Sequence, residues 1–184
     1  MWNKQVFKNA KCCDKSSLLY DFGSYENQGL RDTMEDTHSF STKFQSGLNT
    51  KFDDTNIIPK DMVYVGLFDG HGGNKCSSYC KYMLHHNLAR ELQFRGDPRV
   101  NDHSIVTDSF TSAYLMTQLQ LRNNKIMDGS TAINCIIHRD NIGERWLHAA
   151  GVGDSCIILC RIINDIPTAI VLSKIHKPTE KIER

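Results

Sequence analysis

The sequence predicts an α+β domain in which antiparallel strands are covered by helices or by a second sheet. One strand is followed by two amphipathic helices, and further strands then succeed one another with short turns between them. Strands joined by short turns run antiparallel, because a parallel pair needs a long crossover. The length of 184 residues is enough for one domain with a sizeable core.

The most informative strand is the apolar run 63–68, which ends abruptly in Asp69, Gly70 and His71 and two more glycines. A buried strand that delivers a carboxylate and an imidazole to a glycine-rich turn places polar groups at the edge of a core, where sites are built. The alternative is an ordinary turn after a strand, which is the commoner meaning of Asp-Gly alone. Before this strand, a polar loop leads into a short strand near 38–40.

Two helices are expected after the glycine-rich turn. Apolar residues recur at helical spacing over 74–93, and Gly96-Asp97-Pro98 then breaks the pattern. A second helix is expected over 103–122, with Asp102 or Ser104 as the cap at its start.

The last part of the chain predicts two strand pairs. Strands over 131–137 and 145–152 are joined by a loop at 141–144, and strands over 156–162 and 169–173 are joined at 164–167. Apolar residues occupy consecutive positions in these strands, so we expect burial on both faces.

Composition limits the function classes. Hydrophobic residues make up 40% and charged residues 23% of the chain, and the formal net charge is +1. Nothing therefore steers the whole molecule toward nucleic acid. No apolar run approaches the length of a membrane span, and the first residues lack the apolar segment of a secretory signal. We expect a monomer with no nucleic-acid or membrane partner.

The seven cysteines are odd in number and irregularly spaced. This pattern favours free thiols in a reducing compartment, the cytoplasm or the nucleus. Cys76 and Cys80 with His85 and His86 form an alternative zinc site. A spacing of four puts both cysteines on one helical face, however, where buried cysteines often act as small apolar residues. The Cys-x-x-Cys hairpin of many zinc sites is absent from this stretch.

Both ends of the chain differ from its centre. Residues 1–20 show little periodicity and are expected to form a loose arm with an edge strand near 18–20, and 45–61 is expected to be a surface loop. Residues 176–184 begin a helix that stops after one turn, which is too short to be stable alone. We therefore expect the chain to be a truncated one.

Five motifs occur in order along the chain: Arg31-x-x-Met34-Glu35-Asp36, Phe68-Asp69-Gly70-His71-Gly72-Gly73, Gly129-Ser130-Thr131-Ala132, Gly153-Asp154-Ser155, and Leu172-Ser173 with His176-Lys177-Pro178. In this order and spacing the chain resembles the metal-dependent Ser/Thr protein phosphatases of type 2C (PPM-type). The resemblance covers about 23–184, which would be a partial phosphatase domain after an arm over 1–22. It implies an antiparallel β-sandwich flanked by helices (αββα), truncated at its C-terminus.

The resemblance implies a two-metal centre that hydrolyses phosphoserine and phosphothreonine in phosphoprotein substrates, with Mg²⁺ or Mn²⁺ as the cofactor. These ions favour carboxylate, carbonyl and water ligands, and two of them can hold and activate a shared water. By resemblance, Asp69 bridges both metals, the Gly70 carbonyl binds one of them, and Glu35 adds a contact. Asp36 would act through water, and Asp154 would belong to a third, weaker site.

Two further residues match the family's substrate groups. Arg31 corresponds to the residue that grips the substrate phosphate, which suits a guanidinium because it stays charged and forms a bidentate fork. His71 corresponds to the general acid that protonates the departing serine or threonine oxygen. An imidazole can hold that proton near neutral pH.

The chain also departs from the family pattern. Gly151 stands where an Asn is usual, Cys156 replaces an Arg, and Ile175 replaces an Asp. The family's later metal-binding aspartates, in Asp-Gly and Asp-Asn motifs, would lie beyond Arg184. We therefore expect an incomplete two-metal site and weak or no activity for this chain. The alternative is a non-catalytic phosphatase-like protein that binds a phosphoprotein or scaffolds a partner.

Overall fold

A computed structural model of the protein describes residues 22–42, 62–100 and 102–177. The chain divides into two units, Met1–Met34 and Glu35–Arg184, and all helices and strands of the described residues belong to the second unit. The edge strand predicted near 18–20, the loop 45–61 and most of the last predicted turn lie outside the described residues. The division into an arm over 1–22 and a domain over 23–184 stays a prediction.

A four-stranded antiparallel sheet forms the centre of the second unit. Its strands lie in the order β1 (Thr37–Ser41), β2 (Val63–Phe68), β5 (Ala132–Arg139) and β6 (Arg145–Val152). Strands β2 and β5 are the central pair, and Val63 lies opposite Ile137 while Leu67 lies opposite Ile133. These bounds confirm the strands expected at 38–40, 63–68, 131–137 and 145–152 and their antiparallel pairing.

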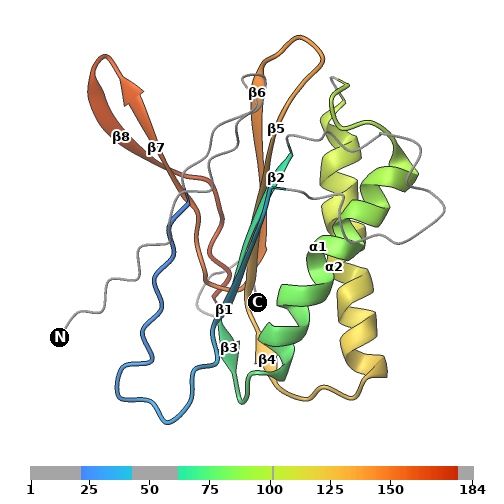
Figure 1. Ribbon diagram of the computed structural model, residues 1–184, viewed down its shortest axis with the longest axis vertical. Helices are drawn as coiled ribbons and strands as arrows, with labels where there is room; N and C mark the ends of the chain where they lie inside the picture. Colours follow the sequence, from blue (N-terminus) through green and yellow to red (C-terminus); the bar gives the residue numbers. More distant parts are fainter. Residues whose placement is uncertain (1–21, 43–61, 101, 178–184) are drawn as a thin grey trace. The chain divides into compact units, whose positions relative to one another are not determined.

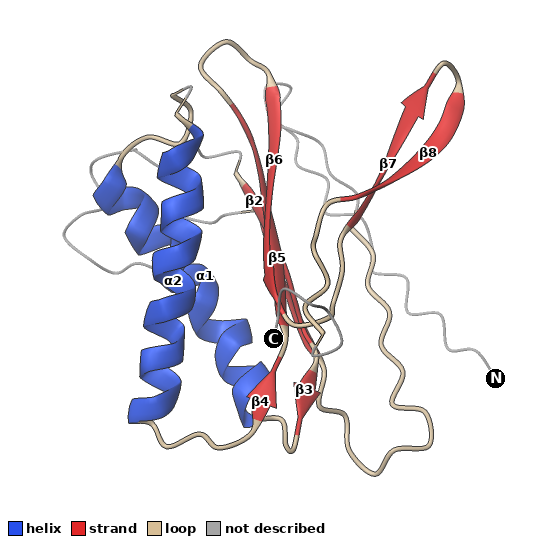
Figure 2. Ribbon diagram, turned by 180° about the vertical axis from the view of Figure 1, so that it is seen from behind, coloured by secondary structure: helices blue, strands red, loops and turns tan. Residues whose placement is uncertain are grey.

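Two long helices, α1 (Lys75–Arg95) and α2 (His103–Asn123), lie side by side and cover one face of this sheet (Figures 1 and 2). The backbone N–H of Gly96 donates to the Leu92 carbonyl where α1 ends. Of the two predicted caps for α2, Asp102 is the one observed: its side chain accepts a hydrogen bond from the N–H of Ser104. Both predicted helices are confirmed.

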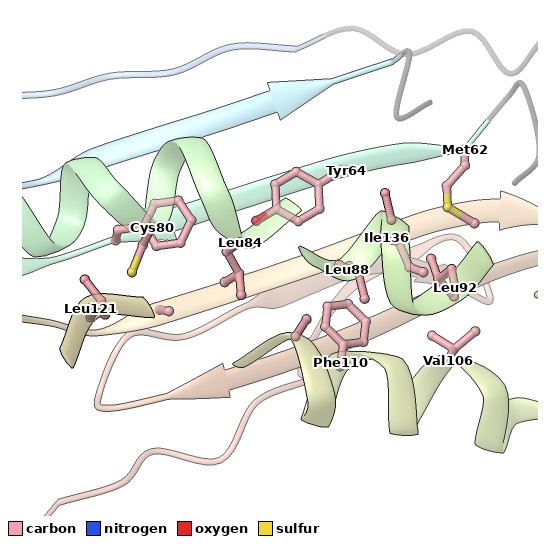
Figure 3. Close-up of a cluster of buried hydrophobic side chains, with 14 of the residues drawn as sticks. Met62, Tyr64, Cys80, Leu84, Leu88, Leu92, Val106, Phe110, Leu121 and Ile136 are labelled. Atoms are coloured by element: carbon pink, nitrogen blue, oxygen red, sulfur yellow. The ribbon is translucent and has the colours of Figure 1, made fainter. Parts of the chain in front are cut away.

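The hydrophobic core lies between the two helices and the sheet (Figure 3). Tyr64 and Ile136 reach it from the central strands, and Leu88 and Leu92 reach it from α1; all four are fully buried.

Among the described residues, no helix is long and apolar enough to cross a membrane.

A hydrogen-bonded polar group crosses this core. Asn134 on β5 is fully buried, accepts a hydrogen bond from the Tyr114 hydroxyl and donates one to the Tyr64 hydroxyl at 2.7 Å. Gly66 makes room for the group, because a β-carbon there would collide with the Asn134 amide and the Tyr64 hydroxyl. The network thus ties α2 to both central strands.

A cluster of aromatic rings lies where α2 begins. His138 and His148 stack with their ring centroids 5.3 Å apart, and His103 lies 5.5 Å from His148 and 4.3 Å from Trp146. The Nε2 atom of His148 is buried and has no hydrogen-bond partner among the described residues. Burial and the neighbouring histidines lower the pKa of His148 to about 4.

The last two strands form a separate hairpin, β7 (Ile158–Ile163) and β8 (Ile166–Val171). It turns at Asn164 and Asp165, which both have a positive φ, so β8 begins before the predicted 169. The expected burial on both faces is confirmed for β5 but is wrong for this hairpin. Most of its side chains are exposed, because among the described residues β7 and β8 contact mainly each other.

The buried Asn134 allows a test of the core network. Asn134→Leu would remove the hydrogen bonds that Asn134 makes with the hydroxyls of Tyr64 and Tyr114, and each such bond is worth about 0.5–1.5 kcal/mol. We expect the free energy of unfolding in urea to fall by about 1–3 kcal/mol. Asn123→Leu, at an exposed position near the end of α2, is the matched control and should change it by less than about 0.5 kcal/mol.

The ring cluster predicts a pH-dependent stability. The folded-state pKa of His148 is about 4, below the ordinary histidine value of 6.5, so the unfolded chain takes up the proton first as the pH falls. We expect stability that is present above about pH 6.5 to be lost between pH 6.5 and 4, with a slope of up to about 1.4 kcal/mol per pH unit per proton.

Urea unfolding at a series of pH values measures this slope. His148→Phe should make it shallower, whereas Tyr82→Phe, at an exposed site, should leave it unchanged. An identical slope in His148→Phe and wild type would contradict the assignment.

Candidate active site

The candidate site is built at the end of the central strand β2. Phe68, the last residue of β2, is fully buried, and Asp69 follows it at the surface. The backbone N–H of Asp69 donates to the Thr131 hydroxyl at 3.1 Å, and the N–H of Thr131 donates to the Asp69 carbonyl at 2.8 Å. Thr131 therefore fixes the backbone that carries the Asp69 carboxylate.

His71 is held by the short antiparallel pair of β3 (Gly70–His71) and β4 (Gly129–Ser130). His71 lies opposite Gly129, and its imidazole packs so closely over this residue that a β-carbon at Gly129 would collide with the ring. A glycine at this position is thus required by the observed placement of the His71 ring.

Glu35 is positioned through its backbone. Its carbonyl accepts a hydrogen bond from the Ser77 hydroxyl in the first turn of α1, and it packs against Gly70, where a β-carbon would collide with it. The Thr37 hydroxyl donates to the Ser77 carbonyl at 3.0 Å, which ties the start of β1 to the same turn. The segment holding Glu35 and Asp36 is thereby fixed beside β3.

Two further carboxylates, Asp36 and Asp154, lie near Asp69. Partial burial raises the pKa of Asp69. The pKa is raised further by Asp36, which also hydrogen bonds to Asp69, and by Asp154, whereas His71 lowers it. Asp154 forms an exposed ion pair with Lys177, with Nζ and Oδ2 3.7 Å apart. The site is therefore an acidic cluster with a histidine beside it.

Thr131 also links the loops that carry Asp69 and Asp154. Its hydroxyl lies 2.7 Å from the Ser155 hydroxyl, and Gly153 packs against it so closely that a β-carbon would lie 2.7 Å from its methyl group. The Gly153 carbonyl accepts a hydrogen bond from the N–H of His176 at 3.0 Å. The chain after β8 is thereby joined to the turn of Asp154.

Comparison with known proteins identifies the family. A profile described as Protein phosphatase 2C matches residues 20–184. The chain belongs to the protein phosphatase 2C family. It is 32% identical over 183 residues to the integrin-linked kinase-associated serine/threonine phosphatase 2C of Rattus norvegicus. The matched region covers 95% of this chain and 44% of the rat protein.

Other relatives agree with this assignment. The Homo sapiens protein of the same name is also 32% identical over 183 residues, with 95% of this chain and 44% of the relative covered. Probable protein phosphatase 2C 43 of Arabidopsis thaliana is 32% identical over 169 residues, with 88% of this chain and 37% of the relative covered. The chain thus spans less than half the length of these type 2C relatives.

The structure brings Asp36, His71 and Asp154 each into contact or electrostatic range of Asp69. It places the Glu35 backbone against Gly70. Arg31 belongs to the first unit, where the Gln28 side chain donates to its carbonyl at 2.7 Å. Its assignment to the substrate phosphate remains a prediction, as do the roles of the other residues.

Members of this family generally depend on Mg²⁺ or Mn²⁺, and the chemistry of the donor set fits such ions. Burial and then the repulsion from Asp36 and Asp154 raise the pKa of Asp69, and a bound divalent cation would relieve that repulsion. Within residues 22–42, 62–100 and 102–177, however, no group of three or more acidic, histidine or cysteine side chains is arranged to hold an ion. The described residues therefore fit the metal in kind but do not form a finished ligand set.

The zinc alternative gains no support, because Cys76, Cys80, His85 and His86 are all described and do not form a group of side chains that could hold an ion. The Cys76 and Cys80 thiols hydrogen bond to each other. The His85 ring packs on His86 at 4.0 Å and on Tyr64 at 5.6 Å.

Two of the family departures have a visible setting. Gly151 on β6 lies opposite Ile133, and a β-carbon there would lie 2.8 Å from the Ile133 side chain, so a small residue fits this strand pair. Cys156 is exposed.

Sequence reasoning gave no role to Thr131 or Asp128, although each supports the site. Asp128 accepts hydrogen bonds from the N–H groups of Lys75 and Cys76, at 2.6 and 3.2 Å, and thereby caps α1. The Gly-Ser-Thr-Ala motif could have pointed to Thr131, which stands in it. Asp128, just before this motif, is a residue type that often caps helices, but it is distant in sequence from α1.

The linking role of Thr131 can be tested by removing its hydroxyl. Thr131→Val keeps the shape of the side chain but loses the hydrogen bonds to Asp69 and Ser155, each worth about 0.5–1.5 kcal/mol. We expect the free energy of unfolding to fall by about 1–3 kcal/mol. Thr111→Val, on the exposed face of α2, is the control, and an equal loss in both variants would contradict a special role for Thr131.

Proposed function

We propose that the protein carrying this chain is a metal-dependent phosphatase of phosphoserine and phosphothreonine. The observation that carries the proposal is the acidic cluster of Asp36, Asp69 and Asp154 beside His71 at the end of β2, in a chain of the type 2C family. Acidic side chains next to a histidine suit the hydrolysis of a phosphate monoester, because the ester needs both charge screening and a proton for its leaving group.

In this proposal the Asp69 carboxylate, the Gly70 carbonyl and Glu35 hold Mg²⁺ or Mn²⁺, Asp36 contributes through water, and Asp154 serves a third ion. Bound ions would supply an activated water and would screen the phosphate charge. The hydrogen bonds between Asp69 and Thr131 orient the carboxylate from a rigid strand end. A fixed position keeps the cost of reorganisation low when substrate arrives.

His71 is proposed as the general acid. Its ring is exposed and packed over Gly129, so it is held in one place and still open to a substrate. It would give its proton to the serine or threonine oxygen as the P–O bond breaks, leaving a neutral alcohol.

Arg31 is proposed to bind the phosphate group of the substrate. Its guanidinium forms bidentate hydrogen bonds with a phosphate and stays charged at all physiological pH values. The substrates in this proposal are phosphoproteins in signal transduction, acted on by a monomer in the cytoplasm or nucleus.

We also infer that β7 and β8 belong to the second sheet of the αββα sandwich that the family resemblance implies. Ile158, Ile162, Ile166 and Val171 of this hairpin are each more than half exposed. Burying such apolar side chains against a second layer would be favourable.

The second candidate function is a non-catalytic phosphatase-like protein that binds a phosphoprotein. It is favoured by the replacement of the family's usual residues at Gly151, Cys156 and Ile175. The two functions differ in one measurable respect, which is turnover of a bound phosphopeptide.

The proposed function is tested with the full-length protein and a phosphothreonine peptide in the presence of Mn²⁺. We expect phosphate release that depends on the metal. His71→Ala should lower kcat by about 10²–10⁴-fold, the usual contribution of a general acid, without weakening Mn²⁺ binding. Asp69→Asn should weaken Mn²⁺ binding in calorimetry as well as activity, because carboxylate charge sets the affinity for hard cations.

His86→Ala, on α1, is the matched control for the histidine variant and should stay within about twofold of wild type. Peptide binding with no metal-dependent phosphate release would favour the non-catalytic alternative. Turnover that survives in Asp69→Asn and His71→Ala would contradict the assigned residues.

A further inference from the structure

A cavity of about 270 Å³ lies behind the candidate site, between α1, α2 and the β3–β4 pair. His71 and Gly129 line it on the side of the site, and Cys76 and Cys80 line it from α1. The two cysteines belong to the hydrophobic core and are each only 6% exposed. The cavity therefore gives a small molecule a route to thiols that the protein surface otherwise covers.

The two thiols are paired with each other. Cys76 precedes Cys80 by four residues, about one helical turn, and the side chains are joined by a hydrogen bond. That hydrogen bond lowers the pKa of the Cys76 thiol, against the opposing effects of burial and Asp128, and raises the pKa of the Cys80 thiol. Cys76 also lies at the start of α1, where the helix dipole favours a thiolate, so Cys76 is the better nucleophile and Cys80 is the thiol next to it.

The pair also lies in the turn that supports the site. The Asp128 carboxylate holds the N–H groups of Lys75 and Cys76, and Asp128 immediately precedes Gly129, over which the His71 ring packs. Any change in the first turn of α1 therefore reaches the β3–β4 pair through Asp128.

We propose that Cys76 and Cys80 are a redox-sensitive dithiol, which a hydroperoxide oxidises to a disulfide and which thereby controls the position of His71. In the first step the Cys76 thiolate attacks one peroxide oxygen, the O–O bond breaks, and Cys76 becomes a sulfenic acid as the peroxide leaves as hydroxide or alkoxide. In the second step the Cys80 sulfur attacks the Cys76 sulfur and releases water, with the Cys80 proton and the sulfenic hydroxyl. The two electrons lost by the thiols reduce the peroxide.

Forming this disulfide requires α1 to change. Residues four apart on a helix have β-carbons about 5–6 Å apart, whereas a disulfide needs about 3.5–4.5 Å. The first turn must therefore unwind, which breaks the hydrogen bonds from Lys75 and Cys76 to Asp128. The β3–β4 pair loses this support, so His71 moves. The regulatory part of the proposal rests on the proposed function, whereas the thiol chemistry does not.

The experiment uses the Cys156→Ser/Cys160→Ser protein, which lacks the two exposed thiols of the described residues. The reduced protein is treated with hydrogen peroxide at pH 7, alkylated, digested with trypsin and analysed by mass spectrometry. Cleavage after Lys75 and Lys81 puts both cysteines in the single peptide 76–81. We expect this peptide to become lighter by two hydrogen atoms and to return to its original mass with dithiothreitol.

Cys135 is the internal reference, because it is buried and burial raises its pKa to about 11. The peptide 76–81 should be oxidised at least about tenfold faster than Cys135. In Cys80→Ala the lighter peptide should disappear, and dimedone should instead trap a sulfenic acid on Cys76. In Cys76→Ser no oxidation of the peptide should occur at the same peroxide dose.

Hydrogen exchange measures the structural consequence. Amides of residues 75–78 and 129–130 should exchange at least about tenfold faster in the oxidised protein, since their hydrogen bonds open. Oxidation of the peptide 76–81 no faster than that of Cys135, or a disulfide with unchanged exchange, would overturn the proposal. Neither readout uses phosphatase activity, so a failure here is distinguishable from a failure of the proposed function.

Discussion

Two hydrogen bonds between Asp69 and Thr131, one to the Thr131 hydroxyl and one from the Thr131 N–H, are the constraint on which the candidate site depends. They join the end of β2 to the start of β5 across 62 positions of sequence, at the point where the buried sheet meets solvent. A flexible loop would let the Asp69 carboxylate turn away from its acidic neighbours, which repel it. The strand ends instead keep the like charges together, and packing in the sheet offsets the repulsion.

Glycine is used in this site to bring polar groups close to the backbone. Gly70 allows the Glu35 carbonyl to pack against β3, and Gly129 allows the imidazole of His71 to lie over β4. Any larger residue would push these groups apart. The short β3–β4 pair therefore does more than extend the sheet, because it sets the separation between the acidic cluster and the proposed acid.

The sequence was enough to predict the strands of the four-stranded sheet and both helices, because each depends on local pattern. The run 63–68 forms β2 as expected, and Asp69 and His71 follow it. Long-range partners were not predictable: the pairing of β3 with β4 and the capping of α1 by Asp128 join residues that two helices separate. The exposure of β7 and β8 was missed for a related reason, since apolar composition does not reveal which element covers a strand.

The first turn of α1 supports both halves of the candidate site. Ser77 in this turn binds the Glu35 carbonyl on the acidic side, and the N–H groups of Lys75 and Cys76 bind Asp128 on the side of His71. Four backbone N–H groups at a helix start have no partner within the helix, so this turn depends on side chains from elsewhere for part of its stability. A chemical change in this turn would therefore alter the proposed metal ligands and the proposed acid together, whereas a change in the middle of α1 would affect only the core.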